Sequence, residues 1–175
     1  MSFDVDIGHT SERGPRADNE DFAAAQRPAP HEEALGFIAA IADGVSAGGG
    51  GRMAAQTTVM ALVQDYFAAP PTWDTTVVLD RVIGAQNRWL AAHNRRSDKA
   101  AMSTLTALAL RGQTWTLAHV GDTRAYLLRG SECRRLTQDH ALDHPDLRSR
   151  LTRAMGQDDV VRVDYLQGEL HLADC

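Results

Sequence analysis

Three short stretches of the sequence bring acidic side chains to places where the chain turns. They read RADNED at residues 16–21, AAIADGVSAGGGG at 39–51 and HVGDTRAY at 119–126. Asp43 follows an apolar run and precedes Gly44, so side-chain and backbone oxygens there could bind a hard divalent cation. Ligands that are all oxygen are typical of Mg²⁺ or Mn²⁺. Each stretch alone could equally be an ordinary turn or a solvated loop, but the three together favour a shared site.

The glycine run at 48–51 suggests phosphate binding, but two familiar patterns do not fit it. A P-loop needs a lysine after its last glycine, and this chain has Arg52 and Met53 there. A dinucleotide fingerprint needs its third glycine where Met53 stands, and that side chain would hold the helix away from the strand. The glycines therefore fit best as a close turn that leads from Asp43 into the next helix.

The histidines of the second half give weaker signals. His140 and His144 are four residues apart, as in a helical zinc pair, but no third ligand stands at a useful spacing and Pro145 would disrupt a helix there. His119 lies in the apolar segment TWTLAHVG and is expected in the core or behind a site. We expect Asp139 and His140 to brace a turn.

Hydrophobic periodicity predicts the elements that must position these residues. The apolar run at 35–42 is short and is followed by glycines, which favours a buried strand. Apolar residues at helical spacing predict helices over 55–66 and 78–92, the second with Asp74 as its N-cap. Alternation predicts a strand at 3–9, and FAAAQ after residue 21 permits another short strand.

The second half changes to short β-rich segments, which read STLTALALR, TWTLAHVG, TRAYLLR and ECRRLT. Glycine-containing turns separate them, and Gly130-Ser131 predicts a two-residue hairpin loop. We expect a four-stranded antiparallel meander, a short helix over 144–156 and a last strand over 160–166. Strands, two helices and then a meander predict an α+β fold rather than a doubly wound α/β fold.

Composition limits the class of protein. The 175 residues fit one domain, and 43% hydrophobic with 23% charged residues is ordinary for a folded chain. A net charge of −5 without a Lys/Arg cluster argues against binding to nucleic acid. The start MSFDVDIGHT does not resemble a signal peptide and no run is apolar enough to span a membrane, so we expect a cytoplasmic protein that does not act at a membrane.

Five ordered stretches, RADNED, IADGVSAGGGG, MSTLTALAL, AHVGDTRAYLL and LTQDHALD, resemble the protein phosphatase 2C (PPM) family of metal-dependent serine/threonine protein phosphatases. The resemblance implies a four-layer α-β-β-α sandwich over the single domain 1–175, with two Mg²⁺ or Mn²⁺ ions at one end of its sheets. DGVS is closer to bacterial members, some of them fused to a kinase domain. This implies a role in bacterial signalling, with a phosphoprotein substrate and a cognate serine/threonine kinase as partners.

The resemblance assigns metal-site roles to five residues. Asp43 corresponds to the carboxylate that bridges both ions, and the Gly44 carbonyl to a ligand of the second ion. Glu20 and Asp21 correspond to acids that act on metal-bound waters, directly or through hydrogen bonds. Asp122 corresponds to an acid at a further, weaker metal position.

A sixth residue, Arg16, corresponds to the guanidinium that clamps the substrate phosphate, a role that its planar donor fork suits. Arg16 and Asp43 are therefore the expected catalytic residues. The implied reaction is hydrolysis of phosphoserine or phosphothreonine by a metal-activated water, without a phosphoenzyme.

The sequence also departs from the family pattern. The late Ser-Asp-Gly and Asp-Asn motifs are absent and the chain stops at GELHLADC, so we expect about two thirds of a domain, truncated before its last metal-binding motifs and binding the first ion weakly. The alternatives are a catalytically inactive binding or regulatory module and one half of a split enzyme.

Overall fold

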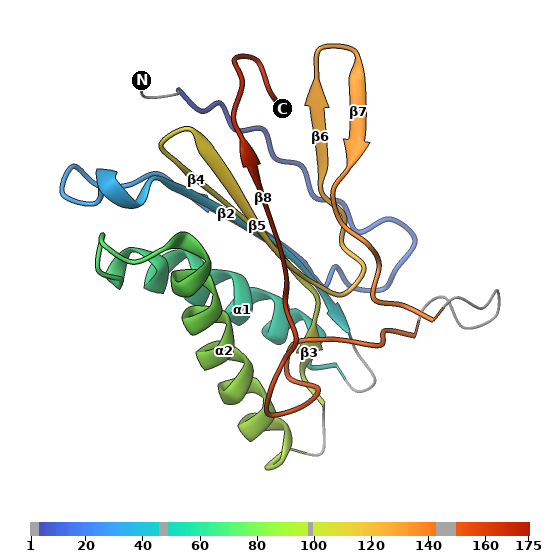
Figure 1. Ribbon diagram of the computed structural model, residues 1–175. Coiled ribbons are helices and arrows are strands. Elements are labelled where there is room, and N and C mark those ends of the chain that lie inside the picture. The colour runs from blue at the N-terminus through green and yellow to red at the C-terminus, as the bar shows by residue number, and fades with distance from the viewer. Residues whose placement is uncertain (1–3, 46–48, 98–99, 143–149) are drawn as a thin grey trace.

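The computed structural model describes the chain except residues 1–3, 46–48, 98–99 and 143–149. Two helices lie against one face of a six-stranded antiparallel sheet, and a separate hairpin lies on the other side of that sheet (Figure 1). The elements are β1 (Asp21–Gln26), η1 (Glu33–Leu35), β2 (Phe37–Val45), α1 (Gly51–Asp65), η2 (Tyr66–Ala68), α2 (Thr75–Asn94), β3 (Met102–Ser103), β4 (Leu105–Arg111), β5 (Thr114–Val120), β6 (Tyr126–Arg129), β7 (Glu132–Arg135) and β8 (Asp164–Glu169).

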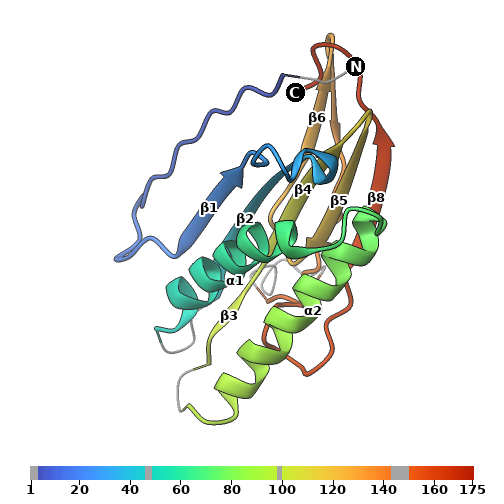
Figure 2. The same ribbon diagram turned by 90° about the vertical axis from the view of Figure 1, so that its left-hand side faces the viewer.

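The main sheet has the strand order β1-β2-β4-β5-β8, with β3 paired to the end of β2, and α1 and α2 cross it side by side (Figure 2). Small residues of β2, β4 and β5 face the helices, among them Ala40, Ala107 and Ala118. Because alanine projects little from the sheet, the helices can lie close to it and fill the layer with larger side chains. Strand β2 confirms the strand predicted at 35–42, and α1 and α2 confirm the two predicted helices.

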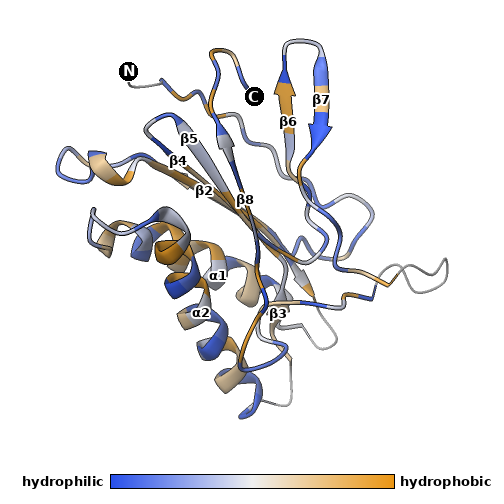
Figure 3. Cartoon of the chain, in the orientation of Figure 1, coloured by the Kyte–Doolittle hydropathy of each residue, from blue (hydrophilic) through white to orange (hydrophobic). Residues whose placement is uncertain are grey.

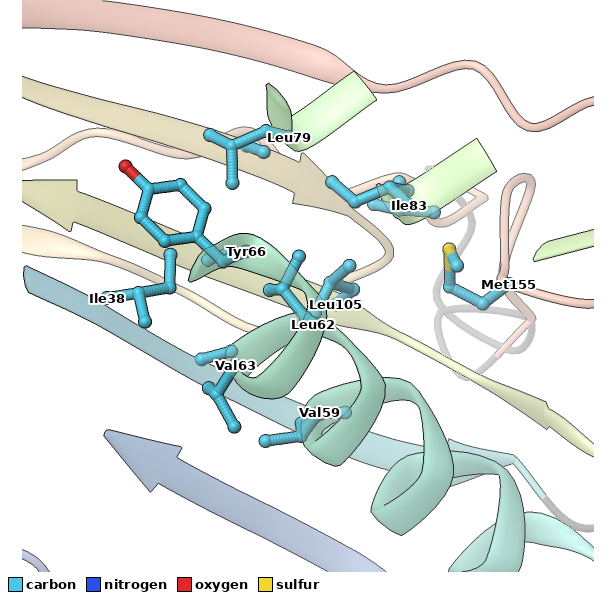
Figure 4. Packing of buried hydrophobic residues seen from close by; sticks show 14 of the residues in the cluster. Ile38, Val59, Leu62, Val63, Tyr66, Leu79, Ile83, Leu105 and Met155 are labelled. Atoms are coloured by element: carbon cyan, nitrogen blue, oxygen red, sulfur yellow. The ribbon is translucent and has the colours of Figure 1, made fainter. Parts of the chain in front are cut away.

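The core lies between the helices and the sheet. Figure 4 shows Ile38 and Leu105 of the sheet meeting Leu62 of α1 and Leu79 of α2, all at most 1% exposed. Tyr66 is also fully buried, and its hydroxyl donates to the Leu35 carbonyl at 2.9 Å. This layer makes the sheet a rigid support for the loops at its ends.

The topology collects three loops at one end of the main sheet. Strand β1 starts where β2 ends, since Asp21 pairs with Asp43. Strand β5 ends where β4 begins, since Val120 pairs with Leu105. The residue before Leu105, Thr104, is hydrogen-bonded to Asp43. The loops before β1, after β2 and after β5 therefore meet.

The strand predicted at 3–9 is wrong for its described part. Residues 4–9 lie outside the strands of the described chain, and Ile7 is 51% exposed. The Val5 carbonyl is bound by the Arg27 side chain instead of a neighbouring strand. Alternation makes a segment compatible with a sheet, but a strand also needs a pairing partner.

The predicted meander is correct in its hairpins but wrong in one pairing. Strands β6 and β7 pair with each other, and Arg129 opposite Glu132 confirms the two-residue loop at Gly130-Ser131. Strand β5 lies between β4 and β8, so its second neighbour is β8 and not β6. The hairpin leaves the main sheet, and Figure 3 shows β7 as strongly hydrophilic, as expected for an exposed strand.

The region after the hairpin also differs from expectation. Of the helix predicted over 144–156, residues 144–149 lie outside the described ranges, and 150–156 carry isolated antiparallel bridges instead of helical turns. The last strand begins later than predicted, at Asp164. Asp74 does stand at the N-cap of α2, although its side chain makes no capping hydrogen bond to the described first turn.

These elements form an α+β fold, as predicted. The described residues provide one helix layer, the main sheet, and the two-stranded β6-β7 sheet on the opposite side. A second helix layer is not formed by this part of the chain. None of the helices in the described ranges has the length and apolar character needed to cross a membrane.

Candidate functional site

Asp43 lies near the end of β2 with its backbone held on both sides by one residue. Its N–H donates to Thr104 Oγ1 at 2.8 Å, and its carbonyl accepts from the Thr104 N–H at 2.9 Å. Thr104 is fully buried, whereas Asp43 is exposed. The carboxylate is therefore presented to solvent from a fixed backbone.

The RADNED loop lies directly beside Asp43. Asp21 is the register partner of Asp43, and the Glu20 carbonyl accepts from the Gly44 N–H at 3.1 Å. Asn19 shapes the entry to β1, because its Oδ1 accepts from the Asp21 N–H at 3.0 Å. The structure thus places the backbones of both predicted acids, Glu20 and Asp21, at the end of β2.

Gly44 is required by close backbone packing. A Cβ on Gly44 would lie 2.3 Å from the carbonyl carbon and oxygen of Gly51, the first residue of α1. The amino end of α1 therefore rests against the Asp43-Gly44 turn. Since that end carries partial positive charge, it favours negative charge at the turn.

Asp122 follows β5 and is half-buried. The preceding residue, Gly121, has a φ of 105°, and a Cβ there would lie 2.5 Å from Thr104 Cγ2. Thr104 therefore contacts the Gly121 turn as well as the Asp43 backbone. One buried side chain connects two of the three acidic loops.

The electrostatics of the folded chain link several of these side chains to Asp43. Although Asp43 is exposed as a whole residue, the neighbouring loops partly desolvate its carboxylate, and this raises its pKa from 3.8 to about 6, assisted by the charge of Asp21, a hydrogen bond with Asp21 and the charge of Asp122. The positive charge of Arg16 opposes this and lowers the pKa. Arg16, Asp21 and Asp122 thus all act on Asp43, although the four come from three separate stretches of sequence.

The donor chemistry fits a hard divalent cation. Desolvation and the repulsion from Asp21 and Asp122 both disfavour the charged form of Asp43, and a cation between the three carboxylates would relieve that repulsion. In the described part of the chain, however, no group of three or more His, Cys, Asp or Glu residues is arranged to hold a metal ion as it stands. Asp21, Asp43, Asp122 and the Gly44 carbonyl are the groups that could contribute to such a site.

The raised pKa predicts how stability changes with pH. Because the folded state favours the protonated Asp43, its contribution to stability is present below pH 3.8 and is lost as pH rises through about 6. Asp43→Asn should therefore be more stable than wild type at pH 8 by about 1 kcal/mol, a figure reduced for solvent screening of an exposed group. Urea denaturation at pH 4 and pH 8 measures this. A variant less stable than wild type at pH 8 would contradict the prediction.

Sequence reasoning missed Thr104 as a site residue. The available signal was STLT at 103–106, where polar side chains interrupt an otherwise apolar strand. The zinc pair is not supported: His144 lies outside the described residues, and His140 binds Gly121 and Asp164. The expectation for His119 is confirmed, since it is 1% exposed.

A mixed α/β fold with acidic residues at one end of its sheet agrees with the protein family that the sequence matches. The family model for protein phosphatase 2C matches residues 44–173, which is most of the chain. The chain therefore belongs to the protein phosphatase 2C family.

Curated relatives agree with this family. Serine/threonine protein phosphatase PstP of Mycobacterium tuberculosis is 34% identical over 134 residues, which are 74% of this chain and 24% of PstP. Probable protein phosphatase 2C 59 of Arabidopsis thaliana is 30% identical over 151 residues, which are 85% of this chain and 47% of the relative. The chain thus spans less than half of the length of either relative.

A solved structure shows the same fold. The serine/threonine phosphatase of S. agalactiae superimposes with a TM-score of 0.78 at 26% identity, covering 97% of this chain and 74% of that one. Nearly all of the present chain therefore has a counterpart in that phosphatase structure, which is the longer of the two.

Proposed function

We propose that residues 1–175 are part of a single PPM-type catalytic domain that hydrolyses phosphoserine and phosphothreonine in proteins with the help of Mg²⁺ or Mn²⁺. The observation that carries the proposal is the joint action of Arg16, Asp21 and Asp122 on the pKa of Asp43. Carboxylates for a cation and a guanidinium for a phosphate at one place are the parts that phosphomonoester hydrolysis needs. Membership of the family supports the same reaction.

The residues of the chain have distinct proposed roles. Asp43 and Asp122 hold negative charge at the site, and Asp21 and Glu20 act on the water that attacks phosphorus. Arg16 binds the phosphate oxygens and orients the ester. A divalent cation bound among these groups would lower the pKa of the attacking water and offset charge on the phosphate.

The test is Mn²⁺-dependent hydrolysis. The chain should release phosphate from p-nitrophenyl phosphate and from a phosphothreonine peptide when Mn²⁺ is present, and EDTA should reduce the rate to background. A phosphotyrosine peptide of the same sequence should be a poorer substrate. Hydrolysis that continues in EDTA would contradict the proposal.

A second candidate is a non-catalytic binding or regulatory module, or one half of a split phosphatase. The observation that favours it is that the described residues contain no ready-made group of three metal ligands. Calorimetric titration with Mn²⁺ separates the candidates, because two well-bound ions support the enzyme and one weak site or none supports the module.

The physiological partner follows from the proposed reaction. A phosphatase of this class needs a phosphoprotein substrate, and we propose a bacterial signalling role with a cognate serine/threonine kinase. The mycobacterial relative is itself named a serine/threonine protein phosphatase.

A further inference from the structure

We propose that His140 is a positioning residue that holds the Gly121-Asp122 turn against Asp43, an inference that rests on the proposed function of this site. His140 is only 6% exposed. It lies 18 residues after Asp122 in the chain and is not itself among the groups expected to bind a cation. Its contribution would be made through the backbone of Gly121.

His140 binds both polar groups of the Gly121 backbone. The Gly121 N–H donates to His140 Nδ1 at 3.1 Å, and the His140 N–H donates to the Gly121 carbonyl at 2.7 Å. With its φ of 105° and Thr104 in van der Waals contact, Gly121 has little freedom left. The position of the next residue, Asp122, is thereby fixed relative to Thr104 and hence to Asp43.

The hydrogen bonds also determine which nitrogen of His140 carries the proton. A backbone N–H can only donate, so Nδ1 must be bare to accept from Gly121. The proton then lies on Nε2, which is 3.0 Å from Asp164 Oδ2 and donates to it. Arg153 Nη1 donates to the other oxygen of this carboxylate at 2.7 Å. It also lies 3.2 Å from Nε2, but Nε2 cannot accept from it while Nδ1 is the bare nitrogen of a neutral ring.

Asp164 is in turn kept as an anion, which suits it to orient the imidazole. Burial acts to raise its pKa, but the hydrogen bonds from His140 and Arg153 and the positive charge of Arg153 outweigh burial and lower it. A carboxylate that accepts a hydrogen bond from a histidine commonly fixes the orientation and the tautomer of the imidazole ring at metal sites. Asp164 begins β8, so the turn at Asp122 is tied to the edge of the main sheet.

The far side of the turn is held separately. Thr123, the residue after Asp122, shares a hydrogen bond of 2.7 Å with Thr106 Oγ1, and Thr106 Oγ1 lies 2.9 Å from His119 Nδ1. Asp122 therefore lies between two residues, Gly121 and Thr123, that hydrogen bonds hold in place. If position 140 only filled space, an apolar side chain would be sufficient there. His140 instead provides an acceptor for the Gly121 N–H, which holds the turn in place.

Two substitutions separate positioning from general stability. His140→Leu keeps an apolar bulk but removes the acceptor for the Gly121 N–H. His140→Asn keeps an acceptor oxygen near the place of Nδ1. Leu79→Ala, in the helix layer, is the control for a variant that is less stable but has an intact turn.

Three measurements test the proposal on the full chain. Nitrogen-15 spectra should show His140 protonated at Nε2. Amide exchange at Gly121 should be faster in His140→Leu, and Mn²⁺ affinity should fall about 10- to 100-fold, as for other residues behind metal ligands. His140→Asn should stay within about threefold of wild type in affinity, and Leu79→Ala should bind Mn²⁺ as wild type does.

The outcomes distinguish this proposal from the proposed function. A proton on Nδ1, or wild-type Mn²⁺ affinity in His140→Leu, overturns the role of His140 even if the chain is an active phosphatase. Mn²⁺ binding that depends on His140 without any phosphate release supports the role of His140 and rejects the enzyme. A wild-type chain that binds no Mn²⁺ overturns both.

Discussion

Replacing Asp43 by alanine should reduce Mn²⁺-dependent phosphate release by at least about 100-fold, because removing residues that merely support metal ligands already costs about 10- to 100-fold. Asp43 is the carboxylate on which Asp21, Asp122 and Arg16 all act. The measurement is kcat on p-nitrophenyl phosphate at saturating Mn²⁺, together with the Mn²⁺ dissociation constant.

The loss should not be caused by unfolding. The hydrogen bonds of Asp43 to Thr104 come from its backbone and remain in the variant. Removal of a carboxylate with a raised pKa should leave stability at pH 8 equal or higher. Asp65→Ala, an exposed position at the end of α1, is the control for the change in charge. Full activity in Asp43→Ala would refute the proposed site.

Gly44→Ala should destabilise the protein by about 3 kcal/mol or more. The added methyl would overlap backbone atoms, and backbone cannot move aside as easily as the end of a side chain can. The new Cβ would be 2.3 Å from the carbonyl group of Gly51, so the start of α1 would have to shift. In thermal denaturation, Tm should fall by about 6–12 °C for a chain of this size.

Gly84→Ala provides a matched control for this substitution. Gly84 lies inside α2, and its nearest contact would be the flexible Arg88 side chain at 3.4 Å. The same chemical change should stabilise the helix there by up to about 1 kcal/mol, because alanine has the higher helix propensity. If Gly44→Ala and Gly84→Ala changed stability equally, the close approach of α1 would not be the reason for a glycine at position 44.

The sequence predicts the elements whose signals are local. The run at 35–42 is apolar, short and followed by glycines, and the helices show their apolar stripes within themselves. Gly130-Ser131 carries its own turn chemistry. These features need no knowledge of distant residues, and the structure confirms each of them.

What the sequence does not predict is pairing between distant segments. Nothing in β5 indicates that its neighbour is β8, whose first residue Asp164 is 44 positions after Val120. The alternation at 3–9 gives no sign that a partner strand is missing. Which strands pair depends on the cost of closing the loops between them and on competition among all strands, so the sequence of one segment does not determine it.

The site divides in the same way. Arg16, Asp21, Asp43 and Asp122 are predicted from their residue types and from the family resemblance, and in the folded chain the first two and Asp122 all influence the pKa of Asp43. Thr104 and His140 act on the site through Gly121 and the Asp43 backbone. Supporting contacts of this kind exist only once the sheet has formed, so the spacing of residues cannot reveal them.

Paramagnetic broadening by Mn²⁺ tests most directly whether the three acidic loops share one cation. In a nitrogen-15-labelled chain, substoichiometric Mn²⁺ should first broaden the amide signals of residues 20–21, 43–44 and 121–122, and EDTA should restore them. Signals from α2 and from the β6-β7 hairpin should stay sharp at that point. Broadening centred elsewhere, or at only one of the three loops, would contradict the shared site.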